Sequence, residues 1–332
     1  MFRIFWLVFI LLGCARVNTL NGNPHDFGKH PKQVVWLQIA GFTEEHLAML
    51  RFGRDNSSEK TAFESASCAG KMWSYNLFNL RPTSHQSFMA QILGKKNISG
   101  NCGDSKRRPL WSYLEEAGYQ IGLFESGASK EDSMEKVFSC KEASSFKKNV
   151  ITWLMRNAEN QRDIFHYQEE RNFKPGIIYY DKSCIKGNVC YSGLFNNVHS
   201  IYSQFYQESV PSFFLLRDFS YQKALKSKNV KQARLILNEL NKLINYFNSE
   251  LKEKDALFLI TSAAPQGIEF PLQGKQWAQF ENNGKNLIYR NPGLMASVLA
   301  SGAGAEHFCG IFEESEIFIR LLWSFKNSKF NL

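Results

Sequence analysis

Two cysteines, Cys184 and Cys190, lie so close in sequence that their thiols could form a disulfide or bind a metal ion together. They flank Lys186-Gly187-Asn188, a stretch whose residues favour a turn that would bring the thiols together. A zinc site is the rival interpretation, but the spacing is not that of a C-x-x-C knuckle and no His lies nearby. In an oxidising compartment the pair predicts a disulfide.

The first residues predict export to such a compartment. The apolar run from Ile4 to Leu12 is too short to cross a bilayer and is typical of an export signal. The sequence Leu11-Leu12-Gly13-Cys14 resembles the lipobox of bacterial lipoproteins, which implies a signal peptide over 1–13 and acylation of Cys14. An uncleaved anchor, or an ordinary signal peptide with a chance cysteine, is the alternative. Ala15 after the cysteine implies sorting to the outer membrane.

If Cys14 is lipidated, six of the seven cysteines remain. Their even number permits up to three disulfides.

Composition predicts a folded protein and argues against one class of partner. The chain has 332 residues, of which 44% are apolar and 21% charged, values that exclude a disordered chain. The net charge of +9 is scattered, without a basic stripe interleaved with aromatic residues, so nucleic acid binding is not expected. A solvated basic surface, or attraction to an anionic membrane or envelope polymer, accounts for the charge.

Helical and strand patterns alternate along the chain after a polar tether at 14–32. Strands are predicted at 34–39, 121–124, 176–180, 209–219 and 257–260, and helices at 87–93, 109–116 and 229–252. Such alternation predicts a mostly parallel sheet with helices on both faces, and a functional site in the loops after the strands.

The C-terminal segment "NPGLMASVLASGAGAEHFCGIFEESEIFIRLL" resembles the end of alkaline phosphatases, where a metal-binding His-x-Gly leads through an apolar strand to a glycine-rich turn. The segment "LFLITSAAPQG" is similar to the family's strand ending in T-[SA]-D-H, and "VVWLQIAGF" to its first strand, which ends in a metal-binding Asp. The resemblance implies an α/β fold, the alkaline-phosphatase-like three-layer sandwich, over residues 33–328. Residues 128–200 would be a family-specific insertion.

The segment "LRPTSHQSFMAQILGKK" resembles the nucleophile segment of the same superfamily, which includes the sulfatases. Counting back from Gly94-Lys95 places Ser84 in the nucleophile position and Ser87 at the serine of the sulfatase motif. A serine hydroxyl needs an activating partner, and the neighbouring His85 is expected to point elsewhere. A distant His could activate Ser84, although no G-x-S-x-G elbow is present. Otherwise Ser84 is expected to cap the helix.

The resemblance also implies two divalent metal ions, and most of their ligands are missing. The degenerate metal positions are Ala40, Ala263, Ala264 and Asn291. The acidic ligand expected after the strand "PSFFLL" aligns with Arg217, beside Asp218, which is either a remnant ligand or a loop cap. Arg217 and Lys95 could leave an anion-attracting cleft, to which His85 could belong. Because alanine has no lone pair to offer, no cofactor is expected; the alternative is zinc or another divalent cation.

These observations predict a catalytically inactive bacterial envelope lipoprotein that acts as a binding or scaffolding module. Its expected partners are the membrane, through the lipid on Cys14, and an anionic envelope component or another protein. It would face the periplasm or the cell surface. The main alternative is an active hydrolase of phosphate or sulfate esters with Ser84 as nucleophile and a displaced metal site. A purely structural envelope protein is the second alternative.

Overall fold

Runs of apolar residues form the centre of the sheet in the computed structural model, which describes residues 30–51, 60–158, 164–185, 189–251, 255–272, 274–283, 287–290 and 293–325. Strand β1, Gln33–Ala40, is buried at every position, as is β10, Ala256–Ala263. A strand that is buried on both faces must lie inside a sheet covered by helices. The continuous apolar pattern at 34–39 and 257–260 therefore predicted central strands.

One sheet contains ten strands in the order β14-β2-β13-β10-β1-β9-β3-β4-β6-β5. The remaining strands of this sheet are β2 (Cys68–Trp73), β3 (Gln120–Ser126), β4 (Val150–Met155), β5 (Phe165–His166), β6 (Ile178–Tyr180), β9 (Ser212–Asp218), β13 (Met295–Gly302) and β14 (Gly310–Glu313). Only β13 runs against its neighbours, so the sheet is mostly parallel, as predicted. Two small hairpins pair β7 (Cys184–Ile185) with β8 (Val189–Cys190), and β11 (Ile268–Glu269) with β12 (Ile288–Tyr289).

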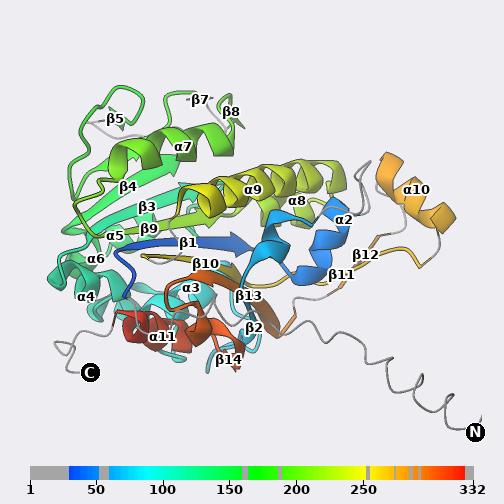
Figure 1. Cartoon of the computed structure of the whole chain (residues 1–332), viewed down its shortest axis with the longest axis horizontal. Coiled ribbons are helices and arrows are strands. Elements are labelled where there is room, and N and C mark those ends of the chain that lie inside the picture. The colour runs from blue at the N-terminus through cyan, green and yellow to red at the C-terminus, as the bar shows by residue number, and fades with distance from the viewer. Residues whose placement is uncertain are drawn as a thin grey trace, which may run out of the picture.

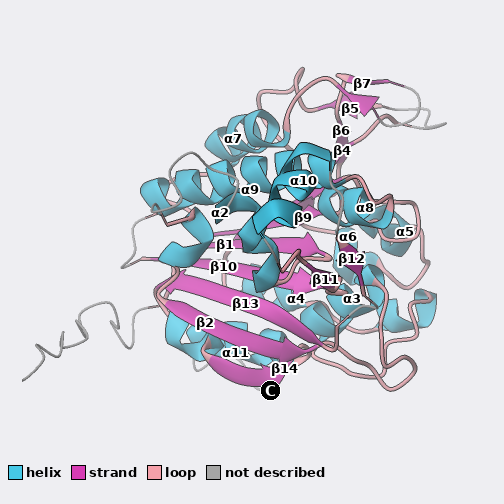
Figure 2. Ribbon diagram, turned by 90° about the vertical axis from the view of Figure 1, so that its right-hand side faces the viewer, coloured by secondary structure: helices cyan, strands magenta, loops and turns pink. Residues whose placement is uncertain are grey.

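Helices cover both faces of this sheet (Figures 1 and 2). One face is covered by α2 (Ala48–Arg51), α7 (Leu194–Phe205), α8 (Ser220–Lys226) and α9 (Val230–Glu250). The other face is covered by α3 (Ser84–Leu93), α4 (Leu110–Glu116), α5 (Met134–Phe138), α6 (Ser144–Lys147) and α11 (Glu316–Ser324). Helix α10 spans Gly274–Asn283. The predicted three-layer α/β architecture is confirmed.

Helix α9 shows how the sequence pattern becomes packing. Its N-terminus is capped by the side chain of Asn229. Its buried residues recur every three or four positions, from Ala233 through Leu237 and Leu240 to Ile244. This apolar stripe lies on the sheet, whereas Leu235 points to solvent. Among the helices that the structure describes, none combines the length and the apolar composition needed to cross a bilayer.

Three disulfides hold segments of this fold together. Cys68 bonds to Cys309, Cys102 to Cys140, and Cys184 to Cys190. All six cysteines that follow Cys14 are therefore paired, as their even number permits. Cys14 itself, with the predicted signal peptide, lies outside the described residues.

Candidate functional site

A cavity of about 380 Å³ opens at the carboxyl ends of the central strands, beside the first turn of α3. Its walls come from that turn, from the segment after α3, from the loop after β10, from α8, and from α5 with the segment before it. The lining residues are Pro82, Thr83, Ser84, His85, Gln86, Ser99, Gly100, Glu131, Asp132, Lys136, Gln222, Lys226, Ala264 and Gln266. Loops that follow parallel strands are the usual place for a binding site in such a sheet, and the predicted residues Ser84, His85 and Ala264 do meet there.

Ser84 lies at the start of α3 without capping it. The cap is Thr83, whose side chain accepts a hydrogen bond from the backbone N–H of Gln86. The prediction that Ser84 caps the helix is wrong, because Ser84 is already the first helical residue and its hydroxyl points to another element. Among the described residues, no hydrogen bond uses the backbone N–H groups of Ser84 and His85. Two free donors of the first helical turn therefore belong to residues of the cavity wall.

Ala40 and Ala263 end their strands side by side, paired in register, and both are buried. Two residues earlier, Gln38 on β1 and Thr261 on β10 each hydrogen bond to Gln91 of α3. Alternate residues of a strand share one face, so Ala40 and Ala263 also face the layer that contains α3. The alanines are placed where ligands on these strands would reach the space beside Ser84.

The side chain of Gln222 occupies that space. Its Oε1 accepts a hydrogen bond from Ser84 Oγ at 2.8 Å, and its Nε2 donates to the backbone carbonyl of Ala264 at 3.4 Å. The same side chain lies over Gly41, where a Cβ would come within 3.0 Å of its Cγ. Gln222 thus connects the start of α3 with the ends of β1 and β10. Lys226, one turn further along α8, donates to the same Oε1 at 3.3 Å.

The backbone around Gln222 shows how closely these elements approach. Gly41 has a φ of 77°, and Ala264 has a φ of 48°, a left-handed conformation that non-glycine residues adopt at a cost of about 1 kcal/mol. The N–H of Gly41 donates to the carbonyl of Ala263 at 2.8 Å, which ties the two strand ends together. Ala264 can keep this conformation because the surrounding contacts fix it.

Neither neighbour of Ser84 is arranged as a general base. A carboxamide oxygen, such as that of Gln222, accepts a hydrogen bond but does not take up a proton at ordinary pH. Burial, together with the charges of Arg217 and Lys136, lowers the pKa of His85 to about 4, so its imidazole is neutral and only weakly basic. The Nδ1 of His85 has no hydrogen-bond partner among the described residues.

Arg217 lies beneath the cavity and does not line it. Its guanidinium pairs with Glu125, donates to Gln38 at 3.2 Å and stacks on the ring of Phe88. Both members of the ion pair are buried. The expectation that Arg217 forms an anion-attracting cleft is therefore wrong, because Glu125 neutralises its charge inside the protein. Lys95 lies beyond the other end of α3 and is also absent from the cavity wall.

Asp218 points to the opposite face of the sheet, because it follows Arg217 by one residue. Its carboxylate accepts hydrogen bonds from Ser220 and from the backbone N–H of Tyr221 at the start of α8. Burial raises the pKa of Asp218 above its ordinary value, and these hydrogen bonds oppose that shift. Of the two predicted roles, the structure gives Asp218 that of a cap, not that of a remnant ligand.

The side chains at the ends of β1 and β10 do not fit metal ions. Ala40, Ala263 and Ala264 offer methyl groups, and Asn291 lies outside the described residues. In the part of the chain that the structure describes, one group of potential ligands lies within reach of a single ion: Asp181, Cys184 and Cys190, whose donor atoms are within 4.8 Å of one another. No step that depends on a metal ion can be assigned to the residues of the cavity.

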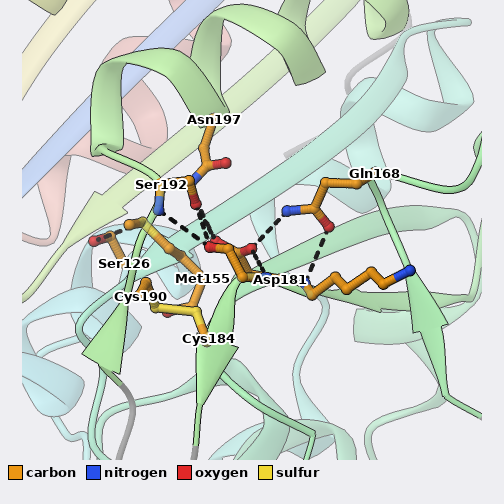
Figure 3. The surroundings of a disulfide bond; sticks show 10 residues. Ser126, Met155, Gln168, Asp181, Cys184, Cys190, Ser192 and Asn197 are labelled. Carbon is orange, nitrogen blue, oxygen red and sulfur yellow. Dashed lines mark hydrogen bonds between the residues drawn. A yellow bond between two sulfur atoms is a disulfide. The ribbon is translucent and has the colours of Figure 1, made fainter.

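That group is a structural unit around a disulfide (Figure 3). The two sulfur atoms bond to each other, so neither can act as a thiolate ligand. Asp181 accepts hydrogen bonds from the backbone N–H of Ser183 and the hydroxyl of Ser192, both at 2.8 Å, and from Asn197 at 3.1 Å. Burial would raise the pKa of Asp181, but these and other hydrogen bonds hold it below its ordinary value.

The comparisons with known proteins agree with this architecture. No family model matches the chain, and no curated protein matches its sequence. Solved structures do match its fold, which is that of the alkaline phosphatases.

Two of these structures are bacterial alkaline phosphatases. The enzyme from the Antarctic bacterium TAB5 is similar over 91% of this chain and 99% of its own, with a TM-score of 0.66 and 13% sequence identity. A cold-active enzyme from a psychrophilic Shewanella matches 89% of this chain and 100% of its own, with a TM-score of 0.69 and 11% identity. A lipoteichoic acid synthase from Listeria monocytogenes matches 93% of this chain and 76% of its own, with a TM-score of 0.54 and 11% identity.

The sequence did not indicate Gln222, nor the residues Gln38 and Thr261 that hydrogen bond to Gln91 of α3. Gln222 is 138 residues from Ser84, and only its position in the first helix after β9 could have drawn attention to it. A polar residue in a short helix gives no signal in a sequence, because polar helical residues generally face solvent. Their burial becomes visible only when the strands are placed.

Proposed function

We propose that this protein is a catalytically inactive member of the alkaline phosphatase fold that uses the cavity beside Ser84 for binding. The observation that carries the proposal is the Gln222 side chain, which accepts a hydrogen bond from the Ser84 hydroxyl, donates one to the Ala264 carbonyl and lies over Gly41, at the ends of β1 and β10. A serine needs a base or a metal ion to become a nucleophile, and neither is supplied at that position.

A small anionic group fits the donors that remain. The free N–H groups of Ser84 and His85 lie at the positive end of the α3 dipole, and Lys136 and Lys226 contribute ammonium groups to the same cavity. Lys136 is partly neutralised by Glu131 at 3.0 Å, so the site favours a single phosphoryl or sulfuryl group over a polyanion. A phosphorylated or sulfated glycan of the envelope is the class of ligand that we propose.

Anchoring of this module to a bacterial envelope is part of the proposal. It rests on the apolar run before Cys14, which would carry the lipid, and on the three disulfides, which suit an oxidising compartment. We propose outer-membrane attachment, facing the periplasm or the cell surface.

The test combines metal analysis, turnover and ligand binding on the same purified protein. We expect no stoichiometric zinc by mass spectrometry, and hydrolysis of aryl phosphates and aryl sulfates no faster than that of a Ser84→Ala variant. A phosphorylated or sulfated glycan should raise the melting temperature, because a ligand that binds only the folded state stabilises it. Lys226→Gln should weaken this shift, whereas Lys231→Gln, on the exposed side of α9, should not change it.

Two alternatives are separated by the same measurements. An active hydrolase is favoured by one observation, the placement of the Ser84 hydroxyl in the wall of an open cavity at a helix start. Stoichiometric metal and turnover that is lost in Ser84→Ala would establish that alternative and refute the inactive module. A protein that binds neither metal nor glycan would instead be a structural component of the envelope.

A further inference from the structure

The turn between β2 and α3 presents three large apolar side chains to solvent. Leu77 is 72% exposed, Phe78 63% and Leu80 73%, although they lie within four consecutive residues. Isolated exposed apolar residues are ordinary, but a contiguous group marks a surface that contacts another body. These three residues are called the apolar turn below.

The apolar turn is held in place by polar contacts on its inner side. Asn76 Oδ1 accepts hydrogen bonds from the backbone N–H groups of Phe78 at 2.8 Å and Asn79 at 2.7 Å. The N–H of Leu77 donates to the carbonyl of Lys96 at 2.9 Å, and Asn79 Nδ2 donates to Gln86 at 3.1 Å. The exposure of the apolar side chains is thus a consequence of a defined turn, which these bonds stabilise.

Cationic residues are frequent in the segment that contains the apolar turn. Residues 74–108 contain one acidic residue, the buried Asp104, and six basic ones: Arg81, Lys95, Lys96, Lys106, Arg107 and Arg108. Arg81 follows the turn directly, and Arg107 donates to Asn97, next to the Lys96 carbonyl that binds Leu77. Among the described residues, Arg81 and Lys95 form no ion pair, whereas Lys96 pairs with Glu313 and Arg108 with Glu116.

We infer that the apolar turn docks the folded domain onto an anionic lipid bilayer. A turn of four residues is too small for a stable protein interface, which takes roughly 800 Å² from each partner. Exposed apolar side chains with the cations Arg81 and Lys95 in the same segment, neither of them in an ion pair among the described residues, match the layered chemistry of a membrane surface, with acyl chains beneath anionic headgroups. This contact is distinct from the proposed lipid on Cys14. It would fix the orientation of the domain and bring the cavity, whose wall includes Pro82, close to the headgroups.

A fluorophore on the turn tests this contact without interference from the N-terminal segment. The full chain with Cys14→Ser has no free thiol, because the other six cysteines are paired, so that Leu80→Cys can be labelled uniquely with an environment-sensitive dye. A matched label at Leu235→Cys, an exposed position on α9, is the control. We expect vesicles of phosphatidylcholine and phosphatidylglycerol to shift the emission of the label at 80 to the blue and to leave the label at 235 unchanged.

Further substitutions in the labelled chain separate the apolar and the charged contributions. Leu77→Ser with Phe78→Ser should lower the apparent vesicle affinity at least about tenfold, because two apolar side chains no longer leave water. Arg81→Gln should lower it about fivefold on anionic vesicles and leave binding to pure phosphatidylcholine unchanged.

Three results would overturn the inference. The first is a chain that sediments with vesicles while the label at 80 stays unshifted, since only the N-terminal segment then binds. The second is a shift that appears on concentrating the protein without lipid, which would identify a second copy of the chain as the occupant. The third is an equal shift with soluble polyphosphate, which would identify a polyanion.

Discussion

Glu314 links the state of the helix that carries Ser84 to pH. Glu314 directly follows β14 and is 1% exposed. Its side chain contacts α3 at Ser87. One carboxyl oxygen accepts hydrogen bonds from Ser87 and from Ser74, at 3.1 Å in the latter case, and the other has no partner among the described residues. Burial raises the pKa of Glu314 from 4.5 to about 8, although hydrogen bonds from Ser87, Ser74 and Gln91 oppose the shift.

The direction of the pH dependence follows from the proton count. Between pH 4.5 and about 8 the folded protein holds a proton on Glu314 that the unfolded chain has released. The free energy of unfolding therefore falls as pH rises through this interval, by at most about 1.4 kcal/mol for each pH unit. Over the whole interval the loss amounts to at most roughly 5 kcal/mol, on the order of a third or more of the stability of an ordinary domain. Above pH 8 the loss is complete, and below 4.5 the group no longer contributes a slope.

Glu314→Gln should remove this slope, because the amide is neutral at every pH and keeps an oxygen that Ser74 and Ser87 can bind. The measurement is the free energy of unfolding in urea, followed by tryptophan fluorescence, at intervals between the two pKa values. The control is Glu313→Gln, which removes a partly exposed carboxylate whose pKa is lowered by its contact with Lys96. An unchanged slope in Glu314→Gln would refute the assignment of the buried proton to this residue.

The remaining predictions concern the buried ion pair and the anchor. Arg217→Met leaves Glu125 buried without its cation and should lower the free energy of unfolding by about 3–5 kcal/mol, whereas Arg217→Met combined with Glu125→Leu should recover most of that loss; a double variant no more stable than the single one in urea would contradict this. Cys14→Ser should leave the exported protein unacylated; identical N-terminal masses and membrane partition for the variant and the parent would exclude the lipid anchor.

The central fold could be predicted because the relevant information is local. The apolar patterns of strand β1 and helix α9 predict both elements, and the observed bounds lie within about two residues of the predicted ones. The antiparallel β13, between β10 and β2, could not be predicted in the same way. Its direction depends on the path of the chain between β10 and β13, which includes α10 and the β11–β12 hairpin and which local patterns do not specify.

The site was predictable only in outline. The order of the motifs predicted that Ala40, Ala263 and Ser84 lie together at the carboxyl ends of the strands. In the structure Ala40 and Ala263 are paired in register at these ends, and Ser84 lines the cavity that opens there. The partners that determine their chemistry come from distant parts of the chain: Ser84 binds Gln222, and Ser87 binds Glu314, 227 residues away. A single sequence contains no measure of such proximity, since buried and exposed polar residues have the same letters.

Together these long-range contacts explain how the cavity could keep its shape without metal ions. Every residue of α3 is buried, and its polar side chains bond to the rest of the protein through neutral groups: Ser84 to Gln222, and Gln91 to Gln38 and to the Ser262 carbonyl at 3.1 Å. Each such bond is worth about 1 kcal/mol when made and more when a buried partner is left unsatisfied. Hydrogen bonds of this kind fix the helix against β1 and β10 whether or not an ion lies between them. Alanines at the ends of β1 and β10 are therefore compatible with a cavity that keeps its shape, as the proposed function requires.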